Sequence, residues 1–180
     1  MPAANEILEF FAESDKLATL AQALQALIGR LPDIKIVFST SLSLEDQAIT
    51  HMIATENLPV RIFTLDTGRH FAETYKTLDS TRERYGVSPE VYFPQTAAVE
   101  KLMRDKGAYS FYVSLEARQE CCGIRKVEPL SRAIRGADLW LTGIRRVHSP
   151  DRSHLPYAEH DHTNNIVKYH PLLDWTDEQL

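Results

Sequence analysis

The sequence has 180 residues, of which 43% are hydrophobic and 25% charged, and its formal net charge is −5. This length fits a single domain, and the composition excludes a disordered or fibrous chain. No run of about 18 apolar residues is available to span a membrane, and Glu6, Glu9 and Glu13 stand where a secretory signal would carry basic residues, so we expect a cytoplasmic protein.

Apolar patterns along the chain predict alternating helices and short buried strands. Helical spacing of apolar residues between Leu17 and Ile28 predicts a helix inside an N-terminal helical segment, residues 1–30. Further helices are predicted around 48–53, 71–78, 99–105 and 127–134, and strands at 34–38, 60–65, 91–93 and 139–142. Because the first three strands begin about 30 residues apart, as in βαβ units, we predict an α/β fold with a doubly wound parallel sheet.

Polar segments follow three of these strands. They are Ser39, Thr40 and Ser41; Asp66, Thr67 and Gly68; and Gly143 to Arg146. In a doubly wound sheet the ligand crevice lies outside the carboxyl ends of the strands, so we expect the three segments to share one edge. Taken alone, Ser39 to Asp46 fits either a phosphate site at a helix start or an ordinary turn. Asp66 and Thr67 either contact a nucleoside or cap the next helix.

Basic residues are concentrated between Arg118 and Arg152, where eight basic and four acidic residues give +4 and leave −9 for the rest of the chain. A basic segment in an acidic chain favours a local anionic ligand over a nucleic-acid surface. Guanidinium groups bind phosphate and sulfate oxygens in a bidentate manner, so Arg145, Arg146 and Arg152 are candidate anion ligands.

The two cysteines, Cys121 and Cys122, are adjacent. A disulfide between neighbours would be strained, because the usual Cα separation is about 5.5–6 Å. The thiols are therefore candidate ligands of a metal or an iron–sulfur cluster, with redox thiols and buried structural residues as alternatives. Four thiolates usually hold a four-iron cluster, and this chain has two.

Together these segments resemble the assimilatory sulfonucleotide reductases, particularly the iron–sulfur branch that reduces adenylyl sulfate. The resemblance runs from about Ile36 to the end of the chain. Its motifs are FSTSLSLEDQ (38–47), FTLDTGR (63–69), ETY (73–75), ECCGIRKVEPL (120–130), TGIRR (142–146) with Ser149, Pro171-Leu172 and Asp174-Trp175.

The resemblance implies a fold of the adenine-nucleotide α-hydrolase (PP-loop) type and one nucleotide-binding domain over residues 1–180. It assigns the hydroxyls of Ser39, Thr40 and Ser41 to a modified pyrophosphate loop. Leu65, Asp66 and Thr67 belong to the adenosine side, and Gly143, Arg145, Arg146 and Arg152 to the phosphosulfate. Cys121 and Cys122 supply half the ligands of a [4Fe-4S] cluster, and Lys126 gives electrostatic support between cluster and substrate.

The implied reaction is thiolate attack on the sulfate sulfur, which releases AMP and leaves an S-sulfocysteine that thioredoxin or glutaredoxin reduces to sulfite. The family's nucleophilic cysteine lies in a C-terminal motif that this sequence lacks. Thr176 to Gln179 has the form of a capping box at a helix start, so we expect the natural chain to continue beyond Leu180. We expect no membrane or nucleic-acid partner, and a homo-oligomer is allowed.

Two positions depart from the family pattern. Ser43 stands where Gly is common, which raises a question about the loop backbone, because a Cβ disfavours positive φ. His148 stands where Gln is common and adds pH sensitivity. His160 and His162 are expected in a solvated loop rather than at a metal. The alternative functions are a reductase of the 3′-phosphorylated substrate and a nucleotide-binding fragment without catalysis.

Overall fold

The structure, a computed structural model, describes residues 4–13 and 19–180. Its helices are α1 (Ala4–Glu13), α2 (Leu20–Arg30), α3 (Leu44–Thr55), α4 (Ala72–Tyr85), α5 (Thr96–Lys106), α6 (Leu115–Cys122) and α7 (Glu128–Ala133). Its strands are β1 (Ile36–Ser39), β2 (Val60–Leu65), β3 (Glu90–Tyr92), β4 (Leu139–Leu141), β5 (Ala158–Asp161) and β6 (Ile166–Tyr169). Four short helical turns are η1 (Ser110–Tyr112), η2 (Gly123–Val127), η3 (Arg146–His148) and η4 (Pro150–Arg152).

The six strands form one sheet in the order β3-β2-β1-β4-β6-β5. All neighbouring pairs are parallel except β5 with β6, which pair as an antiparallel hairpin. The predicted parallel α/β sheet is therefore confirmed, with an antiparallel edge that the sequence analysis did not predict. Asn165 takes a left-handed φ of 49° and turns the chain back at the end of that hairpin.

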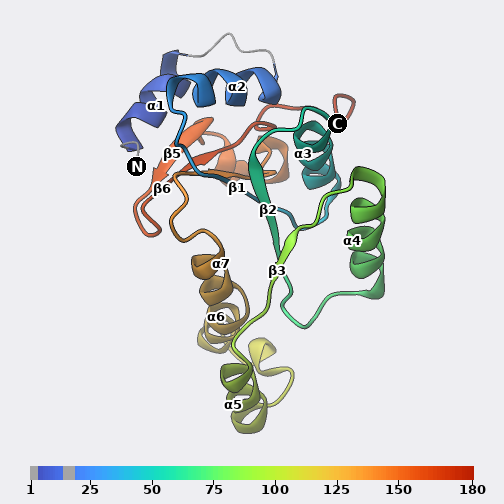
Figure 1. Ribbon diagram of the computed structural model, residues 1–180. Helices are drawn as coiled ribbons and strands as arrows, with labels where there is room; N and C mark the ends of the chain where they lie inside the picture. The colour runs from blue at the N-terminus through green and yellow to red at the C-terminus, as the bar shows by residue number, and fades with distance from the viewer. Residues whose placement is uncertain (1–3, 14–18) are drawn as a thin grey trace.

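Helices cover both faces of the sheet, as a doubly wound fold requires (Figure 1). On one face, alternate strand residues such as Ile36, Phe38 and Leu141 pack against apolar residues of α1, α2 and α3. On the other face, Val37 and Phe63 pack against Ala133 of α7 and its neighbours. The alternation of side chains along β1 thus places its apolar residues in both cores.

The predicted elements are present with shifted ends. The strand over 60–65 is observed with those limits, while β1 starts and ends later than the predicted 34–38. The first predicted helix begins at Leu20, where the Thr19 hydroxyl accepts a hydrogen bond from Gln22 N; Leu17 lies outside the described residues. The capping box forms, because Thr176 Oγ1 accepts from Gln179 N at 3.3 Å and Gln179 Oε1 accepts from Thr176 N at 2.9 Å. Within the described ranges, no helix has both the length and the apolar character needed to cross a bilayer.

Candidate functional site

Three predicted segments meet at the carboxyl ends of the parallel strands, and we call them the carboxyl edge. They are Ser39–Asp46, which starts at the last residue of β1, Leu65–Thr67, which starts at the last residue of β2, and Gly143–Arg146 after β4. Backbone hydrogen bonds continue the strand ladders into these segments, from Thr40 N to Phe63 O at 2.8 Å and from Asp66 N to Tyr92 O at 2.9 Å. The edge predicted from the order of strands and polar turns is therefore present.

Asp46 organises the segment after β1 from inside. Its carboxylate accepts hydrogen bonds from Ser41 N at 2.5 Å and from the Ser41 hydroxyl at 2.7 Å. Burial raises the pKa of Asp46 above its ordinary value, although these bonds from Ser41 act in the opposite direction. Because both donors of Ser41 serve Asp46, the turn has a fixed shape before any ligand arrives.

The backbone at Ser43, where glycine is common in the family, does not require a positive φ. Ser43 has an extended φ of −68°, and its hydroxyl accepts from Asp46 N as the N-cap of α3. The left-handed residue of the turn is Leu42, with φ 66°, while Leu42 N donates to Thr40 Oγ1 at 3.0 Å. A side chain at position 43 therefore fits this turn and contributes to the start of the helix.

Gly143 lets the end of β4 lie directly over the turn after β1. A Cβ at this position would overlap the Asp46 carboxylate and would also lie 3.3 Å from the Glu45 Cβ. The glycine is thus required by close approach between two segments of the carboxyl edge.

The turn after β2 is held by Asp66, whose side chain is almost fully buried. One carboxylate oxygen accepts from Gly68 N at 2.7 Å, and the other accepts from the Tyr75 hydroxyl at 2.8 Å. The bond to Asp66 raises the pKa of Tyr75. His70 Nε2 lies 2.8 Å from the carbonyl oxygen of Leu65. Tyr75 and His70 were not predicted as site residues, although the ETY motif drew attention to this helix.

Arg145 is 2% exposed and is already bound by the protein. Its guanidinium lies 3.4 Å from Glu45 and 2.5 Å from Asp177, and it donates to the backbone oxygen of Trp175 at 3.2 Å. His148 Nε2 lies 3.2 Å from the same Glu45 carboxylate, so the exposed histidine that replaces glutamine joins the charged groups around Arg145.

Arg146 and Arg152 differ in how far the protein uses them. Arg146 pairs with Asp174 at 2.5 Å and donates to the carbonyl oxygens of Arg152, Ser153 and Leu155. Arg152 makes one long hydrogen bond, 3.3 Å, to the carbonyl oxygen of Arg145. Of the three predicted anion ligands, Arg152 therefore has the most donors left for a ligand.

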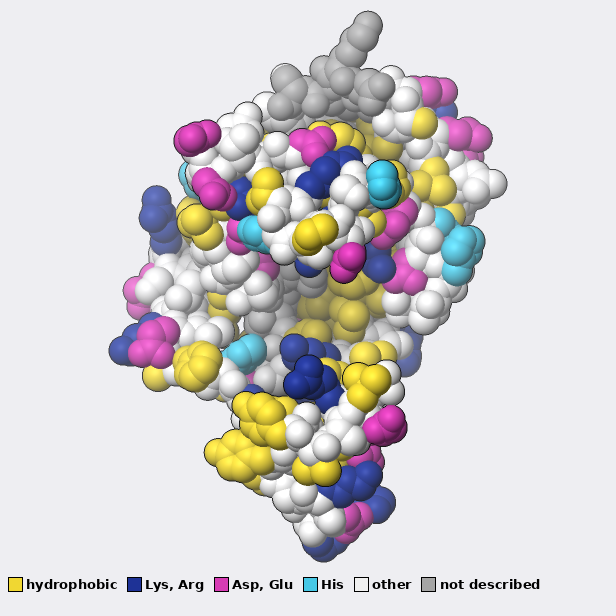
Figure 2. Space-filling model, turned by 180° about the vertical axis from the view of Figure 1, so that it is seen from behind, with side chains coloured by type: hydrophobic (Ala, Val, Ile, Leu, Met, Phe, Trp, Pro, Cys, Tyr) yellow, Lys and Arg dark blue, Asp and Glu magenta, His cyan; other side chains and the backbone are white. Residues whose placement is uncertain are grey.

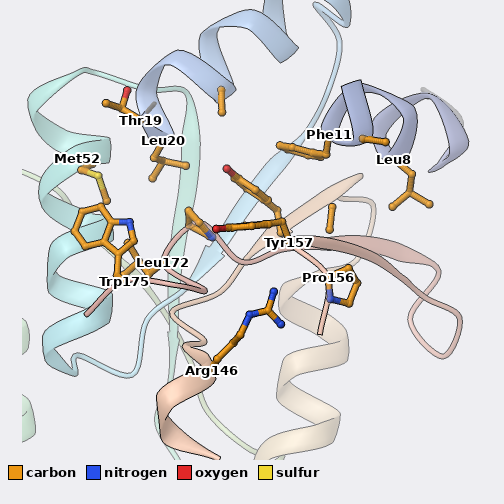
Figure 3. A pocket seen from close by; sticks show the side chains of 15 residues that line it. Leu8, Phe11, Thr19, Leu20, Met52, Arg146, Pro156, Tyr157, Leu172 and Trp175 are labelled. Atoms are coloured by element: carbon orange, nitrogen blue, oxygen red, sulfur yellow. The ribbon is translucent and has the colours of Figure 1, made fainter. Parts of the chain in front are cut away.

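Arg146 also borders a cavity of about 660 Å³ between α1, α2 and the β5–β6 hairpin. In Figure 3 it reaches toward the cavity from the side opposite Phe11 and Leu8 of α1, with Tyr157 between them. Tyr157 donates to Asp174 at 2.8 Å, so the arginine and the tyrosine share one carboxylate.

The segment Cys121–Val127, called the cysteine segment, begins with the two thiols at the end of α6 and continues as the π-helical turn η2. Cys121 is buried and Cys122 is half-buried. Single π-helical turns inside α-helices are frequent at functional sites. The side chains of Cys121, Cys122 and Lys126 make no hydrogen bond or ion pair with any described residue, and Lys126 is exposed.

Arg125 joins the cysteine segment to the carboxyl edge. It is 6% exposed and donates to the carbonyl oxygen of Thr67 at 2.6 Å, across 58 positions of sequence. Its Nε has no hydrogen-bond partner among the described residues. The segment that contains the thiols is therefore connected to the turn after β2 through Arg125. This arginine was not singled out from the sequence.

Thiolates are suitable ligands for a soft metal or an iron–sulfur cluster, but two thiols are fewer than the four that usually hold a four-iron cluster. No group of three or more Cys, His, Asp or Glu side chains in the described residues is arranged to hold a metal ion. His160 and His162, at the far β5 edge, have Nδ1 atoms 3.0 Å apart and likewise find no third ligand there.

The cysteine segment lies in a part of the molecule that projects from the larger body containing the sheet (Figure 1). Figure 1 shows α5, α6 and α7 projecting from the end opposite α1 and α2. Figure 2 shows a hollow on the back of the molecule between this projection and the larger body, with Lys and Arg side chains at its lower rim.

Comparisons with known proteins find a family model and curated relatives that are all sulfonucleotide reductases. The family described as phosphoadenosine phosphosulfate reductase domain matches residues 35–180. A protein from Burkholderia cepacia named adenosine 5′-phosphosulfate reductase is 42% identical over 171 residues, which cover 94% of this chain and 68% of that protein. A protein of the same name from Neisseria meningitidis serogroup B is 44% identical over 170 residues, with the same coverage.

A solved structure shares the fold. The crystal structure of phosphoadenylyl-sulfate reductase from Candida auris, in its phosphate complex, superposes with a TM-score of 0.76 at 23% identity and covers 99% of this chain and 84% of that one.

Proposed function

The chain belongs to the phosphoadenosine phosphosulfate reductase family of sulfonucleotide reductases, and from this premise we propose that it serves the reduction of adenosine 5′-phosphosulfate to sulfite and AMP in sulfate assimilation. The observation that carries the proposal is the contact from Arg125 to Thr67, because it connects the segment that contains the two thiols to the turn after β2, and ligands of doubly wound sheets bind at such strand ends.

The nucleotide is proposed to lie along the carboxyl edge. Hydroxyl and backbone N–H groups at the start of a helix favour a phosphate, which supports a phosphate position at Ser39–Asp46. The turn of Leu65, Asp66 and Thr67 is proposed to contact the adenosine. Since Arg145 and Arg146 are engaged by protein carboxylates, their proposed role toward the phosphosulfate is to shape the loop that carries Arg152.

Lys126 and Arg152 are proposed to neutralise the sulfate end of the substrate. Lys126 is exposed, and its ammonium has no partner among the described residues. Cations already in place where negative charge gathers stabilise a transition state without reorganisation.

Cys121 and Cys122 are proposed as two of the four ligands of a [4Fe-4S] cluster. Their thiol chemistry, their adjacency at a helix end and their lack of protein partners support this role. When bound to Cys121 and Cys122, the cluster would supply a compact charged group to this segment. Any further cysteine ligands would have to come from outside these 180 residues, because the sequence contains two cysteines.

The proposed reaction breaks the bond between the sulfate sulfur and the bridging phosphate oxygen. A cysteine thiolate attacks the sulfur, AMP leaves with the bridging oxygen, and an S-sulfocysteine forms. A dithiol such as thioredoxin or glutaredoxin then reduces this intermediate, so that sulfite leaves and the dithiol becomes a disulfide. Both cysteines of this chain are assigned as ligands, so the attacking thiolate is a third cysteine. The proposed compartment is the cytoplasm.

Competition between the two nucleotides tests the substrate. The intact gene product is assayed for sulfite with adenosine 5′-phosphosulfate and its 3′-phosphorylated form present together. The proposal expects a higher kcat/KM for the substrate without the 3′-phosphate. A clear preference for the 3′-phosphorylated form would replace the substrate assignment, and binding of both without any turnover would indicate a binding module.

A further inference from the structure

Trp140 of β4 reaches across the sheet to the first hydroxyl of the turn after β1. Its indole Nε1 donates a hydrogen bond to Ser39 Oγ at 2.9 Å, although the two residues are 101 positions apart. The contact follows from the strand register, in which Trp140 pairs with Val37 and Ser39 lies two residues further along the same face.

The direction of this bond is fixed by chemistry. An indole N–H is a donor only, so the Ser39 oxygen must be the acceptor and its own hydroxyl proton must point elsewhere. Among the described residues, that proton has no hydrogen-bond acceptor. Ser39 is half-buried, so a ligand at the carboxyl edge can reach it.

The other hydroxyls of the turn differ from Ser39. The Ser41 hydroxyl donates to Asp46, and the Ser43 oxygen caps α3. The Thr40 oxygen accepts from Leu42 N inside the turn, and Thr40 is 4% exposed. Ser39 therefore differs from the other three residues. It is half-buried, its oxygen accepts a hydrogen bond from Trp140 of another strand, and its own hydroxyl proton is available to a ligand.

Trp140 is itself held in place from the next strand. Lys168 of β6 lies over the indole ring, with its Nζ 5.2 Å from a ring centroid, and also pairs with Asp161 at 2.7 Å. The indole is thus fixed between β1 and β6 and cannot easily turn its N–H away.

We infer that Trp140 is a positioning residue for the nucleotide, which acts by directing the Ser39 hydroxyl proton toward the ligand's phosphate. The inference rests on the proposed function, because it assumes that a nucleotide phosphate lies at this turn. It adds a residue that touches no ligand and that works through one hydrogen bond.

The test measures binding of AMP and of adenosine to the 180-residue chain by titration calorimetry. The variants are Trp140→Phe, which keeps an aromatic ring and removes the N–H, Ser39→Ala, and the double variant. Trp175→Phe is the matched control, because its side chain makes no hydrogen bond in the described residues. Thermal unfolding of each variant verifies that it is folded.

We expect Ser39→Ala to weaken AMP binding on the order of tenfold, as for loss of a hydrogen bond to a charged group, and Trp140→Phe to weaken it roughly three- to tenfold. The double variant should bind AMP as Ser39→Ala does, because the tryptophan acts only through the serine. Adenosine, which lacks the phosphate, should bind all variants equally.

Three results would overturn the inference while wild-type AMP binding stands: no change in Trp140→Phe, equal weakening of AMP and adenosine, or multiplication of the two effects in the double variant. If the wild-type chain binds neither AMP nor adenosine 5′-phosphosulfate, the proposed nucleotide site is wrong, and the role of Trp140 is wrong with it.

Discussion

The carboxyl edge and the cysteine segment differ in whether their polar side chains are bound by other groups of the chain. At the carboxyl edge, Asp46, Asp66 and Arg145 are all buried, and each is bound by other groups of the chain. In the cysteine segment, the side chains of Cys121, Cys122 and Lys126 have no such partner among the described residues. Folding therefore fixes the polar groups of the first region, whereas these three side chains of the second region remain without a partner in the described part of the chain.

This difference predicts that the 180-residue chain binds nucleotide but does not turn it over. With adenosine 5′-phosphosulfate and reduced thioredoxin, we expect no sulfite above the blank without protein, because both thiols are proposed as cluster ligands and the sequence contains no third cysteine. The Burkholderia cepacia relative is the positive control. Thioredoxin-dependent sulfite from this chain would show that one of the two cysteines is the nucleophile. The proposed assignment of both thiols as ligands would then be wrong.

Removal of one buried charge should reveal how strongly the carboxyl edge depends on internal pairing. Arg145→Met leaves Glu45 buried without its guanidinium, and we expect a loss of roughly 3–5 kcal/mol in the free energy of unfolding. Arg30→Met is the matched control, since it breaks an exposed pair with Glu13 that contributes about 0–1 kcal/mol. Urea denaturation measures both; equal losses would contradict the distinction.

Close packing at the same edge predicts a smaller effect for Gly143→Ala. The added methyl meets Asp46, and we expect a loss of up to roughly 3 kcal/mol in the free energy of unfolding, together with weaker AMP binding. Gly29→Ala is the control, because a Cβ there meets nothing within 4 Å. This helical position should instead gain up to about 1 kcal/mol. A neutral Gly143→Ala would mean that the two segments can separate.

Two carboxylates should respond to pH with opposite signs. Burial tends to raise the pKa of Asp161, but hydrogen bonds from Lys168 and Asn164 outweigh it and lower the pKa to about 2. This pairing therefore contributes about 2 kcal/mol at neutral pH, fully present above the unfolded value of 3.8 and lost as the pH falls through about 2. The stability difference between wild type and Asp161→Asn should shrink in that window.

Asp46 should behave in reverse, because burial raises its pKa. Its contribution is present below the unfolded pKa and is lost as pH rises through the folded one. The stability of Asp46→Asn relative to wild type should therefore increase with pH. Urea titrations from about pH 2 to pH 7 compare the two variants, and parallel curves would contradict the assigned signs.

The smallest effect on stability is expected in the cysteine segment. Cys122→Ser should change the free energy of unfolding by no more than about 0.5 kcal/mol, because the half-buried thiol has no partner to lose. Iron retained by the intact gene product should fall sharply in the same variant, as measured by metal analysis after anaerobic purification. A large loss of stability with unchanged iron would make this thiol structural.

The parts of the fold that could be predicted are those with apolar runs. Val60–Leu65 was predicted to the residue because it is buried and branched. The strands Ala158–Asp161 and Ile166–Tyr169 were missed because Glu159, His160 and Lys168 interrupt any apolar pattern. These two short strands pack against β4 and α1, which are distant in sequence, and no local pattern shows those contacts.

Residues of the candidate site could likewise be predicted only where a local sequence pattern marks them. Polar residues directly after strands, such as Ser39 and Asp66, could be placed from strand order alone. Arg125 and Trp140 could not, because their contacts cross 58 and 101 residues and no local pattern marks them. The pairing of Arg145 with Glu45 was also hidden, so arginines that looked free for an anion turned out to be engaged by the chain.

The π-helical turn between α6 and α7 has a geometric consequence. Such a turn holds one residue more than an α-helical turn, and each residue rotates an α-helix by 100°. A residue added to a regular α-helix would rotate everything beyond it by 100°, but the wider π-helical turn takes up the extra residue within one turn. Deletion of one residue within Gly123–Val127 would therefore restore a regular helix with little rotation of the two sulfur atoms relative to α7. The facing of the thiols tolerates this change, whereas the local widening of the helix beside them is lost.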